Sequence, residues 1–339
     1  MRKPRHKAPR DSAVATYHVV SRIVNRDFVL GEAEKEQFIS YMRLYERYCG
    51  VQVLTYCLMS NHFHILVAVP KRPAVMPSDQ ALVQRVSESF GKVAASVLED
   101  DLKRAQSSPS GWAEEIRARH FGRMWDVSAF MKTLKQRFTQ WFNKRHKRTG
   151  TLWEGRFRSV LVEGVGTPLA AMATYIDLNP VRAELADDPK DYRWCGYGAA
   201  LGGDARAGAG LAEVVKALPV AETEGLEPLP GYRVLLFGRG VERGATAEGE
   251  PVKKGFSREA ARKVIAEGGK LERVDFLRCR VRYFTDGAVI GSREFVNAVF
   301  EDARERFGPK RKDGARRVAG LDKKEGLFSM RDLRVGRVS

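Results

Sequence analysis

The chain has 339 residues, enough for two ordinary domains that each bury a hydrophobic core. It carries 59 Lys and Arg against 42 Asp and Glu, and the resulting net charge of +17 favours a polyanionic partner. No stretch approaches the roughly 18 continuous apolar residues of a membrane-spanning helix, so a membrane is excluded as a partner and the protein is predicted to be soluble. Nucleic acid is the favoured partner.

The N-terminus and the cysteines indicate the cellular compartment. A basic arm, residues 1–13, is not followed by an apolar segment of the secretory type. The four cysteines have no CxxC spacing, which argues against both a zinc site and a disulfide framework. A reducing cytoplasm is predicted, with association with the nucleoid because of the positive charge. The cysteines are Cys49, Cys57, Cys195 and Cys279.

The first predicted elements are a strand, a helix and a hairpin. Residues 16–24 are rich in β-branched side chains and predict a strand. Residues 32–49 carry aromatic and apolar side chains at three- and four-residue steps, which predicts a helix. Residues 51–58 and 62–69 predict two strands joined by a turn at Ser60 and Asn61.

Helices dominate the next part of the chain. One is predicted over 79–102, and another over 128–146 with Ser128 as N-cap and a regular apolar stripe that favours core packing. A further helix is predicted to begin near Pro168, with Thr167 as N-cap, and to stop at Asn179-Pro180. The order of elements predicts an α+β fold, an antiparallel sheet with packed helices, for which a ferredoxin-like core fits. The stripe consists of Phe130, Met131, Leu134, Phe138, Trp141 and Phe142.

Composition divides the rest of the chain. The first domain is assigned to residues 14–200, a Gly/Ala-rich linker region to 201–250, and a basic accessory region to 251–339. Helices are predicted over 256–267 and 292–307. The second could be the recognition helix of a helix-turn-helix that binds DNA, or part of a small helical domain with a solvated basic tail.

The strand over 62–69 carries a candidate metal site. Residues two apart in a strand share a face, so His62 and His64 project side by side and could share one cation. For an isolated His-x-His pair the more common interpretation is a strand surface that binds nothing. The apolar run that follows His64 implies a buried strand, where polar imidazoles need partners, and this favours the metal site.

The helix predicted to begin near Pro168 carries a candidate nucleophile. Tyr175 and Asn179 are four residues apart and are therefore predicted to share a helix face. A tyrosine hydroxyl can attack a DNA phosphodiester to give a covalent phosphotyrosine link, and Asn179 could supply an oxygen ligand to a metal. The alternative for Asn179 is a residue that merely ends the helix before Pro180.

A basic stretch lies between the histidine pair and the tyrosine. Its cations, with Trp153 and Phe157 among them, could contact phosphates and stack on unpaired bases, although a solvated basic face is the simpler alternative. The DNA-binding candidates here are Lys132, Lys135, Arg137, Lys144, Arg145, Lys147, Arg148, Trp153, Arg156 and Arg158.

Together these segments resemble the single-tyrosine HUH transposases, and more closely the REP-associated tyrosine transposases that act on repeated palindromic elements. Order and spacing agree over roughly residues 14–200. The matching segments are Tyr17-His-Val-Val-Ser-Arg22, Met59-Ser-Asn-His-Phe-His-Ile-Leu-Val67, Gly150-Thr-Leu-Trp-Glu-Gly-Arg-Phe-Arg-Ser159, Tyr175-Ile-Asp-Leu-Asn-Pro-Val-Arg182 and Tyr192-Arg-Trp-Cys-Gly-Tyr197.

The resemblance implies a function. His62 and His64 would be the ligands of a divalent metal, Mg or Mn, Tyr175 the nucleophile, and Asn179 a third ligand. The fold would be a ferredoxin-like HUH core, and the substrate single-stranded DNA with an imperfect hairpin that is cut and rejoined in transposition. Arg22 joins the DNA-binding candidates. Many relatives have Tyr where this chain has Phe138, and if that tyrosine were the nucleophile, this chain would be inactive. The place of Phe138 in the apolar stripe favours packing, so Tyr175 is kept as the predicted nucleophile.

Three classes of function remain. The first is the strand-cutting and strand-transferring enzyme, and the second is a domesticated relative that recognises palindromic repeats without cutting. The third is a metallonuclease that activates water, but such sites usually need several carboxylates. The nearest acid, Asp177, is predicted to point away from Tyr175. A monomer and a homodimer are equally compatible with the sequence.

Overall fold

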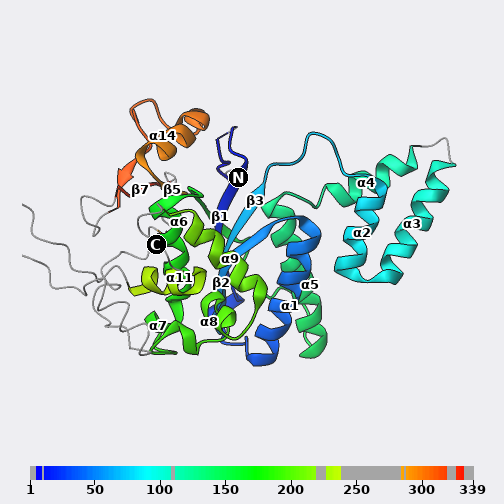
Figure 1. Cartoon of the computed structure of the whole chain (residues 1–339), viewed down its shortest axis with the longest axis horizontal. Coiled ribbons are helices and arrows are strands. Elements are labelled where there is room, and N and C mark those ends of the chain that lie inside the picture. Colours follow the sequence, from blue (N-terminus) through cyan, green and yellow to red (C-terminus); the bar gives the residue numbers. More distant parts are fainter. Residues whose placement is uncertain are drawn as a thin grey trace, which may run out of the picture.

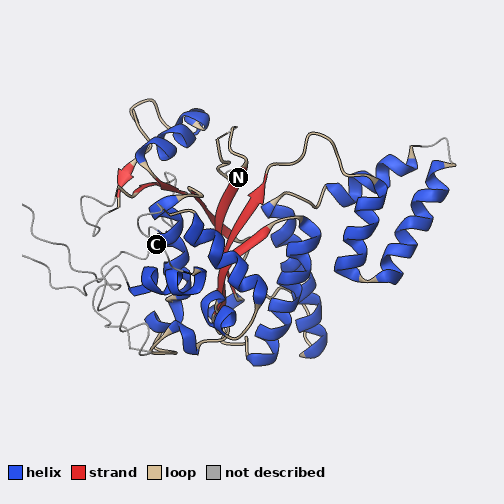
Figure 2. Ribbon diagram, viewed as in Figure 1, coloured by secondary structure: helices blue, strands red, loops and turns tan. Residues whose placement is uncertain are grey.

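The computed structural model describes residues 5–9, 11–107, 111–218, 227–237, 284–285, 288–318 and 326–331. Within these residues the fold is α+β, as predicted, with one seven-stranded sheet and helices on both of its faces (Figure 2). The strands are β1 (Val14–Arg22), β2 (Gln52–Leu58), β3 (His62–Pro70), β4 (Arg158–Val162), β5 (Val289–Gly291), β6 (Arg316–Arg317) and β7 (Phe328–Met330). Their order in the sheet is β2-β3-β1-β4-β5-β7-β6.

The helices follow the chain as labelled in Figure 1. They are α1 (Glu32–Cys49), α2 (Asp79–Phe90), α3 (Lys92–Gln106), α4 (Trp112–Phe121), α5 (Val127–Arg145), α6 (Gly166–Asp177), α7 (Asn179–Arg182), α8 (Gly196–Leu201), α9 (Ala205–Lys216), α11 (Pro228–Phe237) and α14 (Arg293–Asp302). Short 3-10 helices lie at Val24–Arg26, Pro189–Asp191 and Arg304–Arg306.

The N-terminal half has a ferredoxin-like core. Its elements run β1-α1-β2-β3, then α5 and β4, and the four strands lie in the order β2-β3-β1-β4 with every neighbouring pair antiparallel. Helices α1 and α5 pack together on one face of this sheet. The interface is built from aromatic rings: Phe38 of α1 lies 4.8 Å from Phe63 of β3 and 5.2 Å from Phe138 of α5. The apolar stripe over 128–146 is therefore core, as predicted.

The opposite face of the sheet is covered by α6, α8 and α9, which contact β2. Residues 205–216, inside the segment 201–250 predicted to be a Gly/Ala-rich linker, thus form the packed helix α9, and the linker prediction is wrong for this part of the segment. Small residues permit this close packing, because a Cβ atom on Gly210 would lie 2.5 Å from the carbonyl oxygen of Leu54. The many Gly and Ala residues of this segment therefore reflect close contact between α9 and the sheet.

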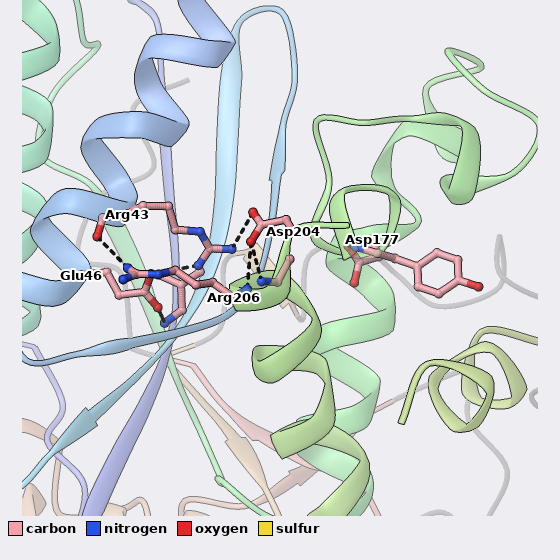
Figure 3. Close-up of polar contacts among 8 residues, drawn as sticks. Arg43, Glu46, Asp177, Asp204 and Arg206 are labelled. Atoms are coloured by element: carbon pink, nitrogen blue, oxygen red, sulfur yellow. Dashed lines mark hydrogen bonds and ion pairs between the residues drawn. The ribbon is translucent and has the colours of Figure 1, made fainter. Parts of the chain in front are cut away.

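A polar network closes the β2 edge of the sheet (Figure 3). Arg43 of α1 donates to Glu46 at 2.9 Å and pairs with Asp204, before α9, at 3.6 Å. Glu46 also accepts from the backbone N–H of Val53 in β2, and Arg206 donates to the Arg43 carbonyl. The network links helices on the two faces of the sheet around its edge strand, an edge that would otherwise be open to further strand pairing.

The helix predicted over residues 79–102 is two helices. Gly91 separates α2 from α3 with a φ of +90°. This backbone conformation is unfavourable for a residue with a Cβ atom, which explains the glycine at this position. Helix α4, which the sequence pattern did not predict, follows, and the three helices project from the sheet (Figure 1).

The ends of two predicted helices also differ. Helix α5 begins at Val127, and its N-cap is Asp126 rather than Ser128, since the Asp126 carboxylate accepts from the backbone N–H of Ala129 at 2.7 Å. Helix α6 begins at Gly166 with Val165 as its N-cap, rather than Thr167. It ends at Asp177, two residues before the predicted stop at Asn179-Pro180, where the separate short helix α7 begins.

The C-terminal region joins the same sheet. Strand β5 pairs parallel to β4, and Ser292 is the N-cap of α14, as predicted. The element directly before α14 is β5, a strand, so the helix-turn-helix hypothesis is wrong for this segment. The helix predicted over 256–267 lies outside the described residues. None of the described helices is long and apolar enough to cross a membrane.

Candidate active site

The two faces of β3 differ sharply in chemistry. Phe63 points to the α1 and α5 side, where its ring lies 5.4 Å from that of Trp153. His62 and His64 point to the other side, with ring centroids 5.1 Å apart. His64 is buried and His62 is half-buried. The predicted pair therefore lies side by side on one face of a central strand.

Helix α6 brings Tyr175 to this histidine pair. Contacts of α6 with β2, β3 and β4 fix the helix across the sheet, and the Tyr175 ring lies 5.8 Å from the ring of His64. Two segments far apart in the sequence, each singled out by its own pattern, thus meet in space. Tyr175 is only 3% exposed.

Asn179 lies one turn beyond Tyr175 and closes the end of α6. Its side-chain nitrogen donates to the carbonyl oxygens of Tyr175 at 2.9 Å and Ile176 at 3.1 Å. This contact satisfies carbonyls that a helix end leaves without intrahelical partners. The side-chain oxygen of Asn179 is not used in these two bonds, and its role as a third metal ligand stays a prediction.

Three further described residues lie around Tyr175, and sequence reasoning missed all of them. His18 of β1 is fully buried, and its ring lies 5.1 Å from His64 and 6.0 Å from Tyr175. The Phe284 ring stacks on Tyr175 at 4.6 Å and 11°. The Arg182 guanidinium lies over the Tyr175 ring, with Cζ at 4.6 Å from its centroid. The stacked Phe284 leaves only the other ring face for Arg182.

Signals for two of these residues were present in the sequence. Arg182 follows Tyr175 by seven residues, which is two helical turns and hence the same face. His18 alternates with the inward-facing Tyr17 and Val19 of β1, but only the strand register shows which histidine it meets. Phe284 has no local signal, because only the tertiary fold brings it to α6.

The three imidazoles are neutral at physiological pH. Burial lowers the pKa of His18 to about 4, and burial together with the nearby Arg22 lowers the pKa of His62 to about 4. Burial also lowers the pKa of His64 well below its ordinary value, with neighbouring His18, His62, Arg22 and Arg182 acting in the same direction. A neutral imidazole is the form that donates a lone pair to a metal.

The donor chemistry of His62 fits a divalent metal. Asn61 donates through its side-chain nitrogen to the carbonyl oxygen of Arg26, which leaves its side-chain oxygen as the acceptor for His62 Nδ1 at 2.7 Å. The proton of neutral His62 therefore sits on Nδ1, and Nε2 carries the lone pair. In the described part of the chain no group of three or more His, Cys, Asp or Glu side chains is arranged to hold a metal, so any ion here would rest on two imidazoles and oxygen ligands.

The strand register places two of the predicted DNA-binding residues on the histidine face. Arg22 lies directly opposite His62 across the β1–β3 pair. Val20 lies opposite both His64 in β3 and Arg158 in β4. Directly opposed residues of antiparallel strands share a face, so Arg22 and Arg158 flank the site. Both side chains are exposed.

Most other cations of the basic stretch lie on or just after α5, across the sheet from Tyr175. Some take part in local contacts: Arg145 pairs with Glu34 at 3.3 Å, and Arg148 donates to the carbonyl of Thr151 at 3.1 Å. Arg148 is half-buried. The exposed members of this group are Lys132, Arg137, Lys144, Arg145, Lys147 and, in the loop before β4, Arg156.

Two residues predicted to bind DNA are part of the core. The ammonium of Lys135 donates to Ser21 at 2.7 Å and to the carbonyl of Gly155 at 2.8 Å, and the side chain is buried. Trp153 is 5% exposed and its indole N–H donates to Thr139 at 2.9 Å. Neither buried side chain is available to DNA. The segment 153–154 pairs with the end of β1, and this pairing places Trp153 beneath α5.

Asp177 is fully buried and points away from the tyrosine, as predicted. Its carboxylate accepts hydrogen bonds from Thr55 at 2.8 Å, Tyr232 at 2.5 Å and the backbone N–H of Tyr197 at 3.1 Å. Burial raises the pKa of Asp177 to about 6. It anchors α6 to β2, α8 and α11 and is no part of the histidine site.

Comparison with known proteins agrees with the resemblance seen in the sequence. Residues 12–108 match the sequence model of the family described as "Transposase IS200 like". The matched segment contains β1 to β3 with all three histidines, which identifies this part of the chain as transposase-like and confirms the resemblance there. It covers less than a third of the chain, and Tyr175 lies outside it.

Solved structures show more distant likeness. A REP-associated tyrosine transposase bound to a REP hairpin has 12% identity and a TM-score of 0.38, with 60% of this chain and 85% of the other covered. A protein from Deinococcus radiodurans R1 described as a transposase has 13% identity and a TM-score of 0.24, with 55% and 92% covered. No curated protein matches the chain.

Proposed function

We propose that the protein is a metal-dependent transesterase that cleaves and rejoins single-stranded, hairpin-bearing DNA through Tyr175. The proposal depends mainly on one observation: the ring centroids of Tyr175 and His64 lie 5.8 Å apart on the polar face of the central strands. The transposase-like identity of residues 12–108 supports DNA as the substrate. A hairpin is favoured because the sequence resembles the REP-associated tyrosine transposases.

The reaction conserves the phosphodiester bond. The phenolic oxygen of Tyr175 forms a bond to phosphorus while the bond from phosphorus to the 3′ oxygen breaks. The phenolic proton leaves the tyrosine, and the departing 3′ oxygen gains a proton to become a free hydroxyl. Attack by a 3′ hydroxyl on the phosphotyrosine reverses these steps and rejoins the strand.

His62 and His64 would hold the divalent ion, Mg or Mn, with Asn179 as the proposed third ligand. Two imidazoles leave coordination positions for phosphate and water oxygens, which these ions prefer. A bound ion would supply Lewis-acid chemistry by polarising the scissile phosphate.

Three arginines surround the proposed phosphate position. Arg182 lies against the Tyr175 ring, and Arg22 and Arg158 lie on the same sheet face as the histidines. Guanidinium groups bind phosphate oxygens with charge-assisted, often bidentate, hydrogen bonds. We infer that Arg182 faces the phosphate under attack, and that Arg22 and Arg158 guide the flanking backbone.

A second function is favoured by one specific observation. Tyr175 is 3% exposed and Phe284 stacks on its ring, so DNA reaches Tyr175 only after side chains packed around it are displaced. A non-catalytic protein that recognises palindromic repeats would need no such displacement. The metallonuclease is the least favoured, because the buried Asp177 is committed to Thr55 and Tyr232.

The test is covalent capture. A 5′-labelled and a 3′-labelled hairpin-bearing oligonucleotide are incubated with the full chain and Mn²⁺, and the products are separated under denaturing conditions. We expect one labelled end to migrate with the protein, with loss of this adduct in Tyr175→Phe, in His64→Ala and in EDTA. Tyr41→Phe is the matched control, because Tyr41 lies on α1, across the sheet from the histidines. Binding without any adduct would favour the non-catalytic function.

A further inference from the structure

His18 is joined to the proposed metal ligand His64 by a directional chain of hydrogen bonds. His18 Nδ1 lies 2.9 Å from the carbonyl oxygen of Phe284, and His18 Nε2 lies 2.9 Å from His64 Nδ1. The two rings are nearly parallel, at 14°. Among the described residues, each imidazole nitrogen of this pair has a hydrogen-bond partner except His64 Nε2.

The carbonyl at one end sets the direction of the chain. A carbonyl oxygen only accepts hydrogen bonds, so the proton of His18 must sit on Nδ1. In a neutral imidazole the other nitrogen then carries a lone pair, and His18 Nε2 accepts. His64 must therefore donate from Nδ1, and its own lone pair is placed on Nε2.

The opposite direction requires a buried charge. If His64 Nδ1 were the acceptor, His18 would have to donate from both nitrogens and would be an imidazolium ion. His18 is 0% exposed. The charged groups near His64, Arg22 and Arg182, are also cations, and isolated burial of a further cation is strongly unfavourable.

From this geometry we propose that His18 is a positioning residue that fixes the tautomer of His64, so that His64 Nε2 presents its lone pair to the metal. The inference rests on the proposed function for the identity of the metal site, but the tautomer itself is a property of the metal-free protein. Through the Phe284 carbonyl, the C-terminal part of the chain becomes an outer support of a ligand carried by β3.

The arrangement gives both histidines of the pair the same presentation. The Asn61 side chain holds the proton of His62 on Nδ1, and His18 holds the proton of His64 on Nδ1. Both Nε2 atoms are then ready to bind without a change of tautomer. Outer partners of this kind typically contribute roughly 10- to 100-fold to metal affinity.

The experiment measures the tautomer and the metal affinity separately. The full chain is labelled with ¹⁵N-histidine, and long-range ¹H–¹⁵N spectra of the metal-free protein report which nitrogen of each of the six histidines is protonated. Signals are assigned by single substitutions. We expect wild-type His64 to show protonated Nδ1 and bare Nε2. A wild-type spectrum with the proton on His64 Nε2 would overturn the proposal.

Two substitutions separate positioning from simple packing. His18→Leu fills the space but offers no acceptor, whereas His18→Gln can place an acceptor oxygen toward His64 Nδ1. We expect His18→Leu to mix the His64 tautomers and weaken Mn²⁺ binding by roughly 10- to 100-fold, and His18→Gln to restore most of this loss. A role in packing alone would lower the melting temperature of both variants and leave the His64 tautomer unchanged, which would refute the proposal.

The proposed function can fail separately. If wild-type protein binds no Mn²⁺, as measured by electron paramagnetic resonance of the free ion, the metal-dependent function is wrong. The tautomer spectra of the wild type and His18→Leu still decide whether His18 fixes the His64 proton. His120→Gln serves as a control, because His120 contacts Tyr48 far from this site and its loss leaves the His64 signals in place.

Discussion

The two faces of the β1–β3 strand pair differ in the side chains that they bury: one is apolar and the other is polar. On the α1 and α5 side, Phe63 meets the rings of Phe38 and Trp153 at 4.8 and 5.4 Å. On the α6 side, the same strands present three histidines to a tyrosine. Buried aromatic rings stabilise a fold by burying apolar area, whereas buried polar groups cost free energy unless they are hydrogen-bonded. The first face is therefore explained by stability, and the second calls for a function.

The same comparison bears on the position of the nucleophile. The ring of Phe138 packs 5.2 Å from that of Phe38 and 5.9 Å from that of Trp153 on the apolar face. It is separated from His64 by the sheet. Tyr175 lies on the histidine face, which supports it as the nucleophile and shows that phenylalanine at position 138 fits a core role.

The largest loss of stability is expected from a substitution on the apolar face. Phe138→Ala removes a fully buried ring and should lower the free energy of unfolding by about 3–5 kcal/mol, measured by urea denaturation. His64→Ala should cost less, about 1–3 kcal/mol, because it removes a hydrogen-bonded polar ring, yet it should abolish Mn²⁺ binding. If Phe138→Ala abolished Mn²⁺ binding while still folded, or His64→Ala preserved it, the division between the faces would be wrong.

The next effect is a pH dependence at the anchor of α6. Burial raises the pKa of Asp177 from 3.8 to about 6, so the folded protein binds this proton more tightly than the unfolded chain does. Its contribution to stability is present in acid and is lost as the pH rises from about 4 to about 6, with a total of about 3 kcal/mol. In Asp177→Asn the free energy of unfolding should lose this dependence.

The measurement is urea denaturation of wild type and Asp177→Asn at pH 4, 5, 6 and 7. Asp100→Asn, at an exposed position of α3, is the control and should keep the wild-type profile. Identical pH profiles for wild type and Asp177→Asn would show that this carboxyl is not held neutral by burial.

The smallest expected effects are on DNA affinity, and they compare surface cations on the two faces of the sheet. Arg22→Gln or Arg158→Gln, on the histidine face, should weaken binding of a hairpin oligonucleotide about five- to tenfold, whereas Lys144→Gln, on α5, should weaken it about twofold or less. Fluorescence anisotropy at several salt concentrations measures both. A larger loss for Lys144→Gln would place the DNA on the α5 side of the sheet.

Sequence patterns predicted elements far better than contacts across the molecule. Residues 32–49 form a helix with those very limits, and the His62 and His64 pair lies on one strand face, because both features depend on local periodicity. Lys135 and Trp153 were misassigned to DNA binding because charge and aromaticity along the chain do not reveal burial. Whether such a side chain faces solvent depends on the pairing of the 153–154 segment with β1.

Other features could not be predicted for a different physical reason. Helix α9 has a linker-like composition, yet its small residues serve close packing against β2. The contacts of His18 with His64, and of Phe284 with Tyr175, follow from strand register and from a C-terminal segment that joins the sheet. Such long-range contacts leave no periodic trace in one sequence.

The most direct test of the central claim identifies the residue that carries DNA after cleavage. Wild-type protein is incubated with a hairpin-bearing oligonucleotide and Mn²⁺, digested with nuclease and protease, and examined by mass spectrometry for a peptide bearing a nucleotide. We expect one modified peptide, with the nucleotide on Tyr175 of α6. A nucleotide on any other tyrosine, or cleavage that leaves no modified peptide, would contradict it.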